Sequence, residues 1–286
     1  MDITRRSFMM GTAAALLAAK RGYAQEATPA LRLSACDWSL GAGGPGGLEI
    51  AKAVGLDGLE VSAGSPTDIL DIAKEDYRQQ YKDGEAKTGV VVSSVAMGFL
   101  NNAPLATDPR GPAWLEQTID ATKALDAKVI LLAFFGAGDL RKHRELKADC
   151  VDVVVERLKD AAPRAAEAGV ILGLENTLSA KDNMAIIERV KSDAVRVYYD
   201  IGNSTDNGYD VPGEIRMLKD QICQFHFKDG SHFLGEGRVA MEPVVEAIRA
   251  IAYKGWIVLE TAMPTKDRDA DFKKNAAYVR GILQMS

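Results

Sequence analysis

The sequence predicts a single domain with a closed (β/α)8, or TIM, barrel fold. Short apolar runs rich in β-branched and aromatic residues alternate eight times with helix-like segments, the pattern of parallel βα units. No Gly-x-Gly-x-x-Gly phosphate loop follows the first run, which disfavours a doubly wound open sheet. The chain has 286 residues, 47% hydrophobic and 26% charged, enough for one large barrel. The barrel domain is expected over residues 25–286.

Eight strands and eight helices are predicted in strict alternation. The strands are expected at residues 31–38, 58–62, 90–97, 129–135, 170–175, 195–200, 222–226 and 256–260. The helices are expected at residues 47–54, 75–87, 113–125, 146–168, 181–191, 212–219, 241–253 and 269–283.

The connections between these elements fall into two kinds. Segments 53–58, 87–89, 168–169 and 253–255 join helix to strand, and each contains a glycine suited to the left-handed residue that ends a helix. Segments 41–47, 100–112, 136–140 and 230–237 are longer and follow strands. These longer segments should gather at the C-terminal mouth of the barrel, where the active sites of this fold lie.

The first 24 residues have the layout of a cleavable export signal. Arg5 and Arg6 precede Ser7 and Phe8, an apolar run extends to residue 19, and small residues lead to Ala24. The run is shorter than the roughly 20 residues of a membrane span, and the paired arginines indicate the twin-arginine type. A general secretory signal is the alternative. Either signal predicts a periplasmic or secreted protein without a membrane span after cleavage, and the first makes the twin-arginine machinery an expected partner.

The charge balance argues against a nucleic-acid partner. The formal net charge is −5, with acids and bases interspersed, and removal of residues 1–24 makes it −8 over 262 residues. A small neutral or cationic ligand is expected, and a homo-oligomer is left open. Cys36, Cys150 and Cys223 lie in apolar segments, which favours buried thiols over a disulfide framework.

Four polar residues end four consecutive predicted strands. They are Glu175, Asp200, His226 and Glu260. A carboxylate or an imidazole is costly to bury alone, so four at neighbouring strand ends indicate convergence on one cation. Three carboxylates and an imidazole suit Mn²⁺ best, with Mg²⁺ or Co²⁺ as alternatives.

Such a metal site supports proton transfer at a carbon atom. A divalent cation can hold adjacent hydroxyl and carbonyl oxygens of a sugar and stabilise the enediolate formed on deprotonation. Glu175 and Glu260 are the candidate catalytic residues, because two carboxylates on opposite sides of one carbon allow proton exchange on either face. The predicted function is a divalent-metal-dependent sugar isomerase or epimerase acting on a keto-sugar or related polyol.

The same residues carry a resemblance to the xylose-isomerase-like sugar isomerase and epimerase superfamily. The matching segments are Gly173-Leu-Glu-Asn176, Tyr199-Asp-Ile-Gly-Asn203, Phe225-His-Phe-Lys-Asp229 and Leu259-Glu-Thr261, with Asp57-Gly-Leu-Glu60 and Gly235-Glu-Gly-Arg238. The resemblance implies a metal held by the four strand-end residues, with the two glutamates exchanging the proton as in ketose 3-epimerases. This chain departs from many members at Asn203, where they carry a histidine. An asparagine can bond a sugar oxygen but cannot titrate near neutral pH.

Further residues are candidate substrate contacts, each with a structural alternative. The candidates are Trp38, Glu60, Asn203, Lys228 and Arg238. Glu60 could instead bind backbone amides or basic side chains, Lys228 could pair with a ligand carboxylate, and Arg238 could be solvated. Trp38 could finish the core, as could Phe135, while His143 and His232 are expected on the surface.

Three other functions use related folds or residues. A metal-dependent endonuclease would need several zinc ions and many histidines, and the chain has three, which excludes it. A metal-dependent lyase or dehydratase acting on a keto-sugar or keto-glycoside would use the same metal and glutamates, so the sequence does not separate it from an isomerase. A non-catalytic sugar-binding barrel is disfavoured because both proton-transfer glutamates are present.

Overall fold

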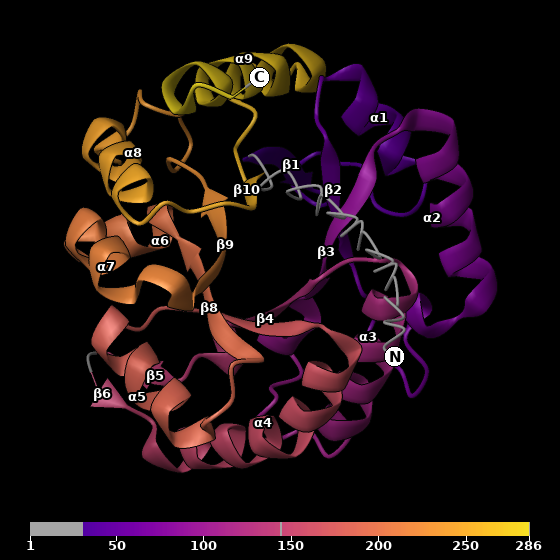
Figure 1. Ribbon diagram of the computed structural model, residues 1–286, viewed down its shortest axis with the longest axis vertical. Helices are drawn as coiled ribbons and strands as arrows, with labels where there is room; N and C mark the ends of the chain where they lie inside the picture. Colours follow the sequence, from indigo (N-terminus) through magenta and orange to yellow (C-terminus); the bar gives the residue numbers. More distant parts are fainter. Residues whose placement is uncertain (1–30, 144, 286) are drawn as a thin grey trace, which may run out of the picture.

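The computed structural model describes residues 31–143 and 145–285, which form one closed barrel surrounded by helices (Figure 1). The eight barrel strands are parallel to their neighbours and follow the order β1-β10-β9-β8-β7-β4-β3-β2. The predicted fold class is therefore confirmed. The predicted export signal, residues 1–24, lies outside the described residues.

The strands begin and end close to their predicted positions. They are β1 (Arg32–Cys36), β2 (Gly58–Ser62), β3 (Val91–Met97), β4 (Val129–Phe134), β7 (Ile171–Asn176), β8 (Val195–Asp200), β9 (Ile222–Phe227) and β10 (Trp256–Leu259). The first residues of the strands agree best, each within one residue of the prediction, whereas the last residues differ by up to two.

The helices surround the barrel as a ring (Figure 1). They are α1 (Gly47–Ala53), α2 (Glu75–Thr88), α3 (Gly111–Ala124), α4 (Ala148–Ala168), α5 (Ala180–Val190), α6 (Ile201–Asp206), α7 (Val211–Leu218), α8 (Met241–Ala250) and α9 (Arg268–Leu283). The last helix meets the first βα unit, because Arg280 of α9 donates hydrogen bonds to the Gly55 carbonyl and the Asp57 carboxylate at 3.0 Å each. This contact helps to close the ring.

The structure adds local elements that the sequence pattern did not indicate. Helix α6 lies where no helix was predicted, and it begins because Asp200 Oδ1 accepts hydrogen bonds from the backbone N–H groups of Gly202 and Asn203 at 2.8 Å. Leu146, the expected start of a helix, instead ends the short hairpin of β5 (Arg141–Lys142) and β6 (Glu145–Leu146). Short 3₁₀ turns occur at η1 (Asp71–Ala73), η2 (Gly98–Asn101), η3 (Gly136–Gly138) and η4 (Lys219–Gln221).

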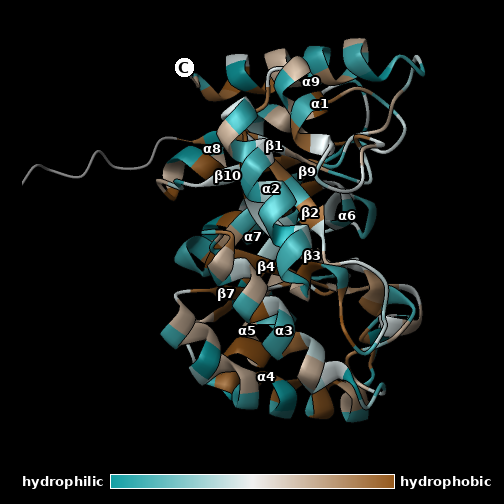
Figure 2. Cartoon of the chain, turned by 90° about the vertical axis from the view of Figure 1, so that its right-hand side faces the viewer, coloured by the Kyte–Doolittle hydropathy of each residue, from teal (hydrophilic) through white to brown (hydrophobic). Residues whose placement is uncertain are grey.

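The apolar core has two layers that follow from strand alternation. Along β4, Val129, Leu131 and Ala133 face the barrel interior, whereas Ile130, Leu132 and Phe134 pack against the helices. Figure 2 shows brown, hydrophobic strands at the centre and teal, hydrophilic faces on the outer side of the helices. The interior layer therefore separates the two mouths of the barrel.

Two of the helix-ending glycines have the expected geometry. Gly89 after α2 and Gly169 after α4 adopt left-handed conformations with φ of 74° and 68°. All three cysteines are free thiols, with Cys36 fully buried and Cys150 and Cys223 half-buried. Over residues 31–143 and 145–285, none of the helices combines the length and apolar character that crossing a membrane requires.

Candidate active site

The four predicted strand-end residues lie together at the C-terminal mouth. One ligand atom from each of Glu175, Asp200, His226 and Glu260 lies within 4.8 Å of all the others. Strands β7, β8, β9 and β10 are consecutive around the barrel, and the parallel register sets Asp200 beside His226. Glu175 lies in β7 and Glu260 directly follows β10, and these are the two outer strands of this set. We call these four residues the cage.

Direct contacts join the members of the cage. His226 Nδ1 lies 2.8 Å from Glu175 Oε1 and 3.4 Å from Glu260 Oε2. Lys228 Nζ lies 2.8 Å from Asp200 Oδ2 and 2.6 Å from Glu260 Oε2. The ammonium group of Lys228 therefore bridges two carboxylates of the cage. This is the pairing with a ligand carboxylate that the sequence offered as the structural alternative for Lys228.

Burial and neighbouring charge give the cage carboxyls different properties. Burial raises the pKa of Glu175 to about 7, although His226 opposes the shift. Burial also raises the pKa of Asp200, against the opposing charge of Lys228. For Glu260 burial acts in the same sense, but His226 and Lys228 outweigh it and lower its pKa. The pKa values of the two glutamates are thus shifted in opposite directions.

A cavity of about 440 Å³ opens above the cage. Its lining comes from loops and strand ends on all sides of the mouth: Trp38, Ser62, Gly64, Ala96, Gly98, Phe99, Asn101, Leu131, Ala133, Phe135, Glu175, Asn203, Lys228 and Glu260. Mostly apolar walls with a few convergent polar groups are typical of small-molecule sites.

Three of the predicted substrate contacts lie on this cavity. Trp38 is 42% exposed, and its Nε1 donates a hydrogen bond to Glu260 Oε1 at 3.1 Å. Asn203 Nδ2 donates to Asp200 Oδ2 at 2.7 Å, and Lys228 completes the group. Each residue has an exposed or half-buried part facing the space above the cage.

The other two predicted contacts do not line the cavity. Arg238 has a side chain that is 72% exposed and pairs at 2.9 Å with Asp206, the last residue of α6. Glu60 is fully buried beneath the cage, where its Oε1 lies 2.8 Å from His226 Nε2. Glycine-rich flanks placed Arg238 on a mouth loop, but they carried no information about its direction.

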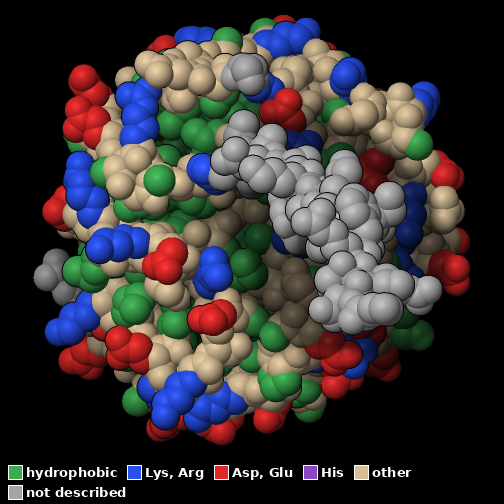
Figure 3. Space-filling model, viewed as in Figure 1, with side chains coloured by type: hydrophobic (Ala, Val, Ile, Leu, Met, Phe, Trp, Pro, Cys, Tyr) green, Lys and Arg blue, Asp and Glu red, His purple; other side chains and the backbone are tan. Residues whose placement is uncertain are grey.

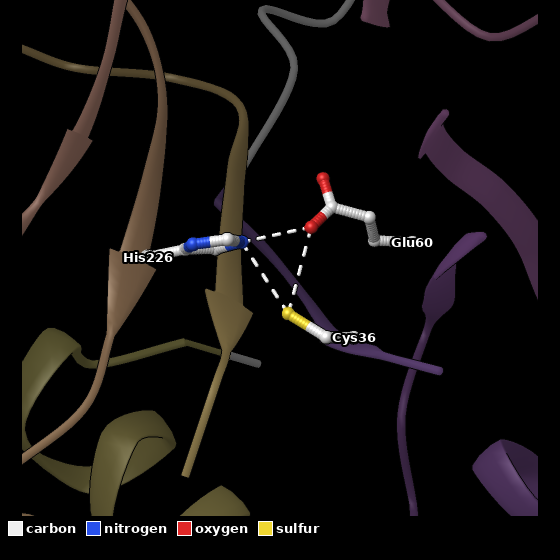
Figure 4. Close-up of side chains that lie close together, drawn as sticks. All are labelled: Cys36, Glu60 and His226. Atoms are coloured by element: carbon white, nitrogen blue, oxygen red, sulfur yellow. Dashed lines mark hydrogen bonds and ion pairs between the residues drawn. The ribbon is translucent and has the colours of Figure 1, made fainter. Parts of the chain in front are cut away.

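Sequence reasoning missed several residues around the site. Phe99 and Asn101 reach the cavity from η2, a turn with no distinctive local pattern. Cys36 lies beneath the cage, with its Sγ 3.3 Å from His226 Nε2 and 3.5 Å from Glu60 Oε1 (Figure 4). Strand alternation in β1 was the one sequence signal that could have predicted that Cys36 faces the barrel interior.

The cage residues fit a divalent cation by their chemistry. Three carboxylates and one imidazole form a hard, oxygen-rich donor set. Two of the carboxylates already share the ammonium group of Lys228, which shows that their oxygens face a common point where positive charge is stabilised.

Comparisons with known proteins agree with the fold. A family model described as the xylose isomerase-like TIM barrel matches residues 48–282. The chain is 26% identical over 227 residues to 2-epi-5-epi-valiolone 7-phosphate 2-epimerase from an Actinoplanes species, covering 76% of this chain and 82% of that protein. The solved structure of L-ribulose 3-epimerase is similar with a TM-score of 0.72 at 22% identity, covering 89% of this chain and 95% of that one. The apo form of 3-keto-D-glucoside 4-epimerase from E. coli also gives 0.72, at 16% identity and with 88% and 99% coverage. The chain belongs to the xylose isomerase-like TIM barrel family.

Proposed function

We propose that this protein is a divalent-metal-dependent sugar isomerase or epimerase that transfers a proton at a carbon of a keto-sugar or related polyol. The observation that carries the proposal is the cage, four ligand atoms within 4.8 Å at the floor of a cavity of about 440 Å³. The relatives named above are epimerases, which supports the same class of reaction.

The donor set favours Mn²⁺, with Mg²⁺ or Co²⁺ as alternatives, held by Glu175, Asp200, His226 and Glu260. When bound, the cation would stabilise negative charge on substrate oxygens next to the carbon that loses its proton.

The two glutamates supply the proton transfer. Both line the cavity, and they approach it from β7 and from the end of β10, on either side of the cage. Two carboxylates on either side of one carbon can act in turn as the base that accepts a proton and the acid that returns one. Inversion at the carbon follows when the proton leaves from one face and returns to the other.

The remaining cavity residues suit recognition of a sugar. Phe99 and Phe135 offer apolar faces for the C–H side of a ring, and Trp38 adds a third aromatic group. Asn203 and Lys228 offer N–H donors to hydroxyl or carbonyl oxygens. The cavity volume of about 440 Å³ falls within the range of small-molecule sites.

A deuterium-exchange experiment tests the proposal. Mn²⁺-loaded protein is incubated with a panel of keto-sugars and keto-glycosides in D₂O, and the products are read by NMR. We expect deuterium at a carbon beside the carbonyl in a product that keeps all the substituents of the substrate. Loss of a β-substituent would identify a lyase, and metal binding without any exchange would identify a non-catalytic barrel. Protein treated with a chelator is the matched control.

We further propose that residues 1–24 direct twin-arginine export, which gives a periplasmic or secreted enzyme. The paired Arg5 and Arg6, followed by Ser7 and Phe8, support this proposal because they match the twin-arginine type of signal. Twin-arginine export carries folded cargo, so metal can be loaded in the cytoplasm first. Replacing both arginines by lysine should retain the protein in the cytoplasm, as cell fractionation would show. Continued export of that variant would instead indicate a general secretory signal.

A further inference from the structure

A buried polar network fills the centre of the barrel beneath the cage. It consists of Glu60, Ser94, Tyr198, Gln224 and His226, each at most 1% exposed. The five residues come from β2, β3, β8 and β9, and His226 alone belongs also to the cage. None of them lines the cavity above, so substrate contact does not explain their polarity. Burial of so many polar atoms is costly unless each has a partner.

The directions of the hydrogen bonds in this network are determined by counting donors. Gln224 Nε2 donates to Ser94 Oγ at 2.8 Å and to Tyr198 Oη at 2.9 Å, which uses both amide hydrogens. Each hydroxyl has a single hydrogen left to donate. Both hydrogens go to Glu60 Oε2, at 2.6 Å from Ser94 and 2.8 Å from Tyr198.

The other oxygen of Glu60 then determines the state of the histidine. Glu60 Oε1 lies 2.8 Å from His226 Nε2, close enough for a strong hydrogen bond in which the ring N–H donates. The Cys36 thiol is a weaker second donor at 3.5 Å. A hydrogen on Nε2 leaves Nδ1 as the ring nitrogen that faces Glu175 and Glu260.

The plane of the ring is held as well. Tyr198 packs edge-on against His226, with ring centroids 4.5 Å apart, and Trp38 contacts it from the mouth at 6.1 Å. Figure 4 shows Glu60 and Cys36 pointing at the same edge of the imidazole.

We propose that Glu60 is a positioning residue that keeps a hydrogen on Nε2 of His226 and thereby presents Nδ1 to the metal cage. Its effect on activity rests on the proposed metal site. Carboxylates that orient a ligating histidine in this way raise metal affinity without touching substrate. Ser94, Tyr198 and Gln224 in turn orient the carboxylate.

A different ligand arrangement uses the same atoms. Cys36, Glu60 and His226 could together hold a second metal ion. The separation of 2.8 Å between Glu60 Oε1 and His226 Nε2 is that of a hydrogen bond, and Glu60 Oε2 already accepts two hydroxyls. The geometry therefore favours positioning, and metal stoichiometry separates the two arrangements.

The first test reads the histidine directly and needs no change at Glu60. The chain has three histidines, so ¹⁵N NMR of the rings can be assigned to His226 with His143→Gln and His232→Gln variants. A hydrogen on Nε2 is expected in both the metal-free and the Mg²⁺-loaded wild-type protein. An Nε2 that carries no hydrogen would overturn the proposal, whether or not the metal site exists.

The second test measures Mn²⁺ affinity by competition with a fluorescent chelator. Glu60→Ala should weaken binding about 10–100-fold. Glu60→Gln, whose amide oxygen can still accept from Nε2, should recover part of the loss, and Cys36→Ser should change affinity less than about twofold. Circular dichroism checks that each variant is folded.

The outcomes separate this inference from the proposed function. Wild-type protein that binds no Mn²⁺ refutes the metal-dependent function, while the NMR result for His226 stands by itself. One bound ion with unchanged affinity in a folded Glu60→Ala refutes the positioning role alone. Two bound ions, one of them lost in Cys36→Ser, would also refute it in favour of a second metal site.

Discussion

The two mouths of the barrel hold cavities of nearly equal volume that differ in the charged groups that line them. The cavity at the C-terminal mouth measures about 440 Å³ and contains Glu175 and Glu260, whereas the one at the N-terminal mouth measures about 430 Å³. The second is lined by Trp256 and several charged groups: Lys128, Arg196, Lys219, Asp220 and Lys254. Figure 3 views the molecule from the side where β1 begins, and Lys and Arg side chains lie beside a hollow in the part of this face that is visible.

Buried, converging charge distinguishes the two mouths, whereas the volumes of their cavities do not. At the C-terminal mouth Glu175 and Asp200 are each 4% exposed and contact basic groups directly. At the N-terminal mouth Lys128, Lys219 and Lys254 are exposed, and no ion pair of theirs is found in the part of the chain that the structure describes. Water can solvate these lysines at little cost, whereas the buried carboxylates require specific partners.

The largest expected difference between the mouths is in turnover. Glu175→Gln and Glu260→Gln should each reduce turnover at least about 100-fold, because each removes a group that we propose transfers the proton. Lys128→Gln and Lys254→Gln, at the other mouth, should stay within about twofold of wild type. Deuterium exchange into a substrate measures the rate of every variant. Near-normal exchange in the two glutamate variants would refute the proposed mechanism.

The next effect concerns Lys228, whose ammonium group pairs with two carboxylates of the cage. Lys228→Met leaves Asp200 and Glu260 without their ammonium partner, so the metal-free protein should lose about 1.5–3 kcal/mol of unfolding free energy. Mn²⁺ should bind more tightly and restore stability, because a competing positive charge is gone. Thermal unfolding with Mn²⁺ and with chelator measures both effects.

Lys254→Met is the matched control for this experiment, since Lys254 is exposed at the opposite mouth. Its unfolding free energy should change by less than about 0.5 kcal/mol. Equal stabilities of the two variants, with unchanged Mn²⁺ affinity, would show that Lys228 does not stabilise the negative charge of Asp200 and Glu260.

A packing change at the N-terminal mouth should affect stability alone. A Cβ on Gly58 would come within 2.6 Å of the Trp256 ring, so Gly58→Ala should cost about 1–3 kcal/mol of unfolding free energy. Turnover should be unchanged, because the cage lies at the other end of the barrel. Urea denaturation and activity test this, and Trp256→Leu added to Gly58→Ala should recover part of the stability. A loss of turnover without a loss of stability would contradict the separation of the mouths.

The smallest effect is a pH dependence at a buried carboxyl outside the cage. Burial raises the pKa of Asp37 above its ordinary value of 3.8, although Ser62 donates two hydrogen bonds to it. The folded state therefore holds this proton more tightly than the unfolded state. The resulting stability is fully present below pH 3.8 and is lost as the pH rises through the folded pKa.

Urea unfolding of wild-type protein and Asp37→Asn across this range measures the effect. The stability of wild type relative to the variant should fall with rising pH, by up to about 1.4 kcal/mol for each unit by which the pKa is raised. A difference that does not vary with pH would show that burial leaves Asp37 unshifted.

Much of the candidate site could be predicted because local pattern and parallel topology act together. Glu175, Asp200, His226 and Glu260 each follow an apolar run, and the ends of parallel strands meet at one mouth. The direction of Arg238 toward Asp206 was out of reach of the same reasoning, because loop side chains have no periodicity that indicates where they point.

The sequence by itself determined the alternation of strands and helices and the mouth to which the polar strand ends belong, since hydrophobic periodicity depends on neighbouring residues. Only the tertiary structure decided that Glu60 lies beneath His226, 166 residues away, rather than in the cavity. The reason is physical: the depth of an inward side chain depends on the stagger of strands around the closed barrel, and that stagger is set by all eight strands together.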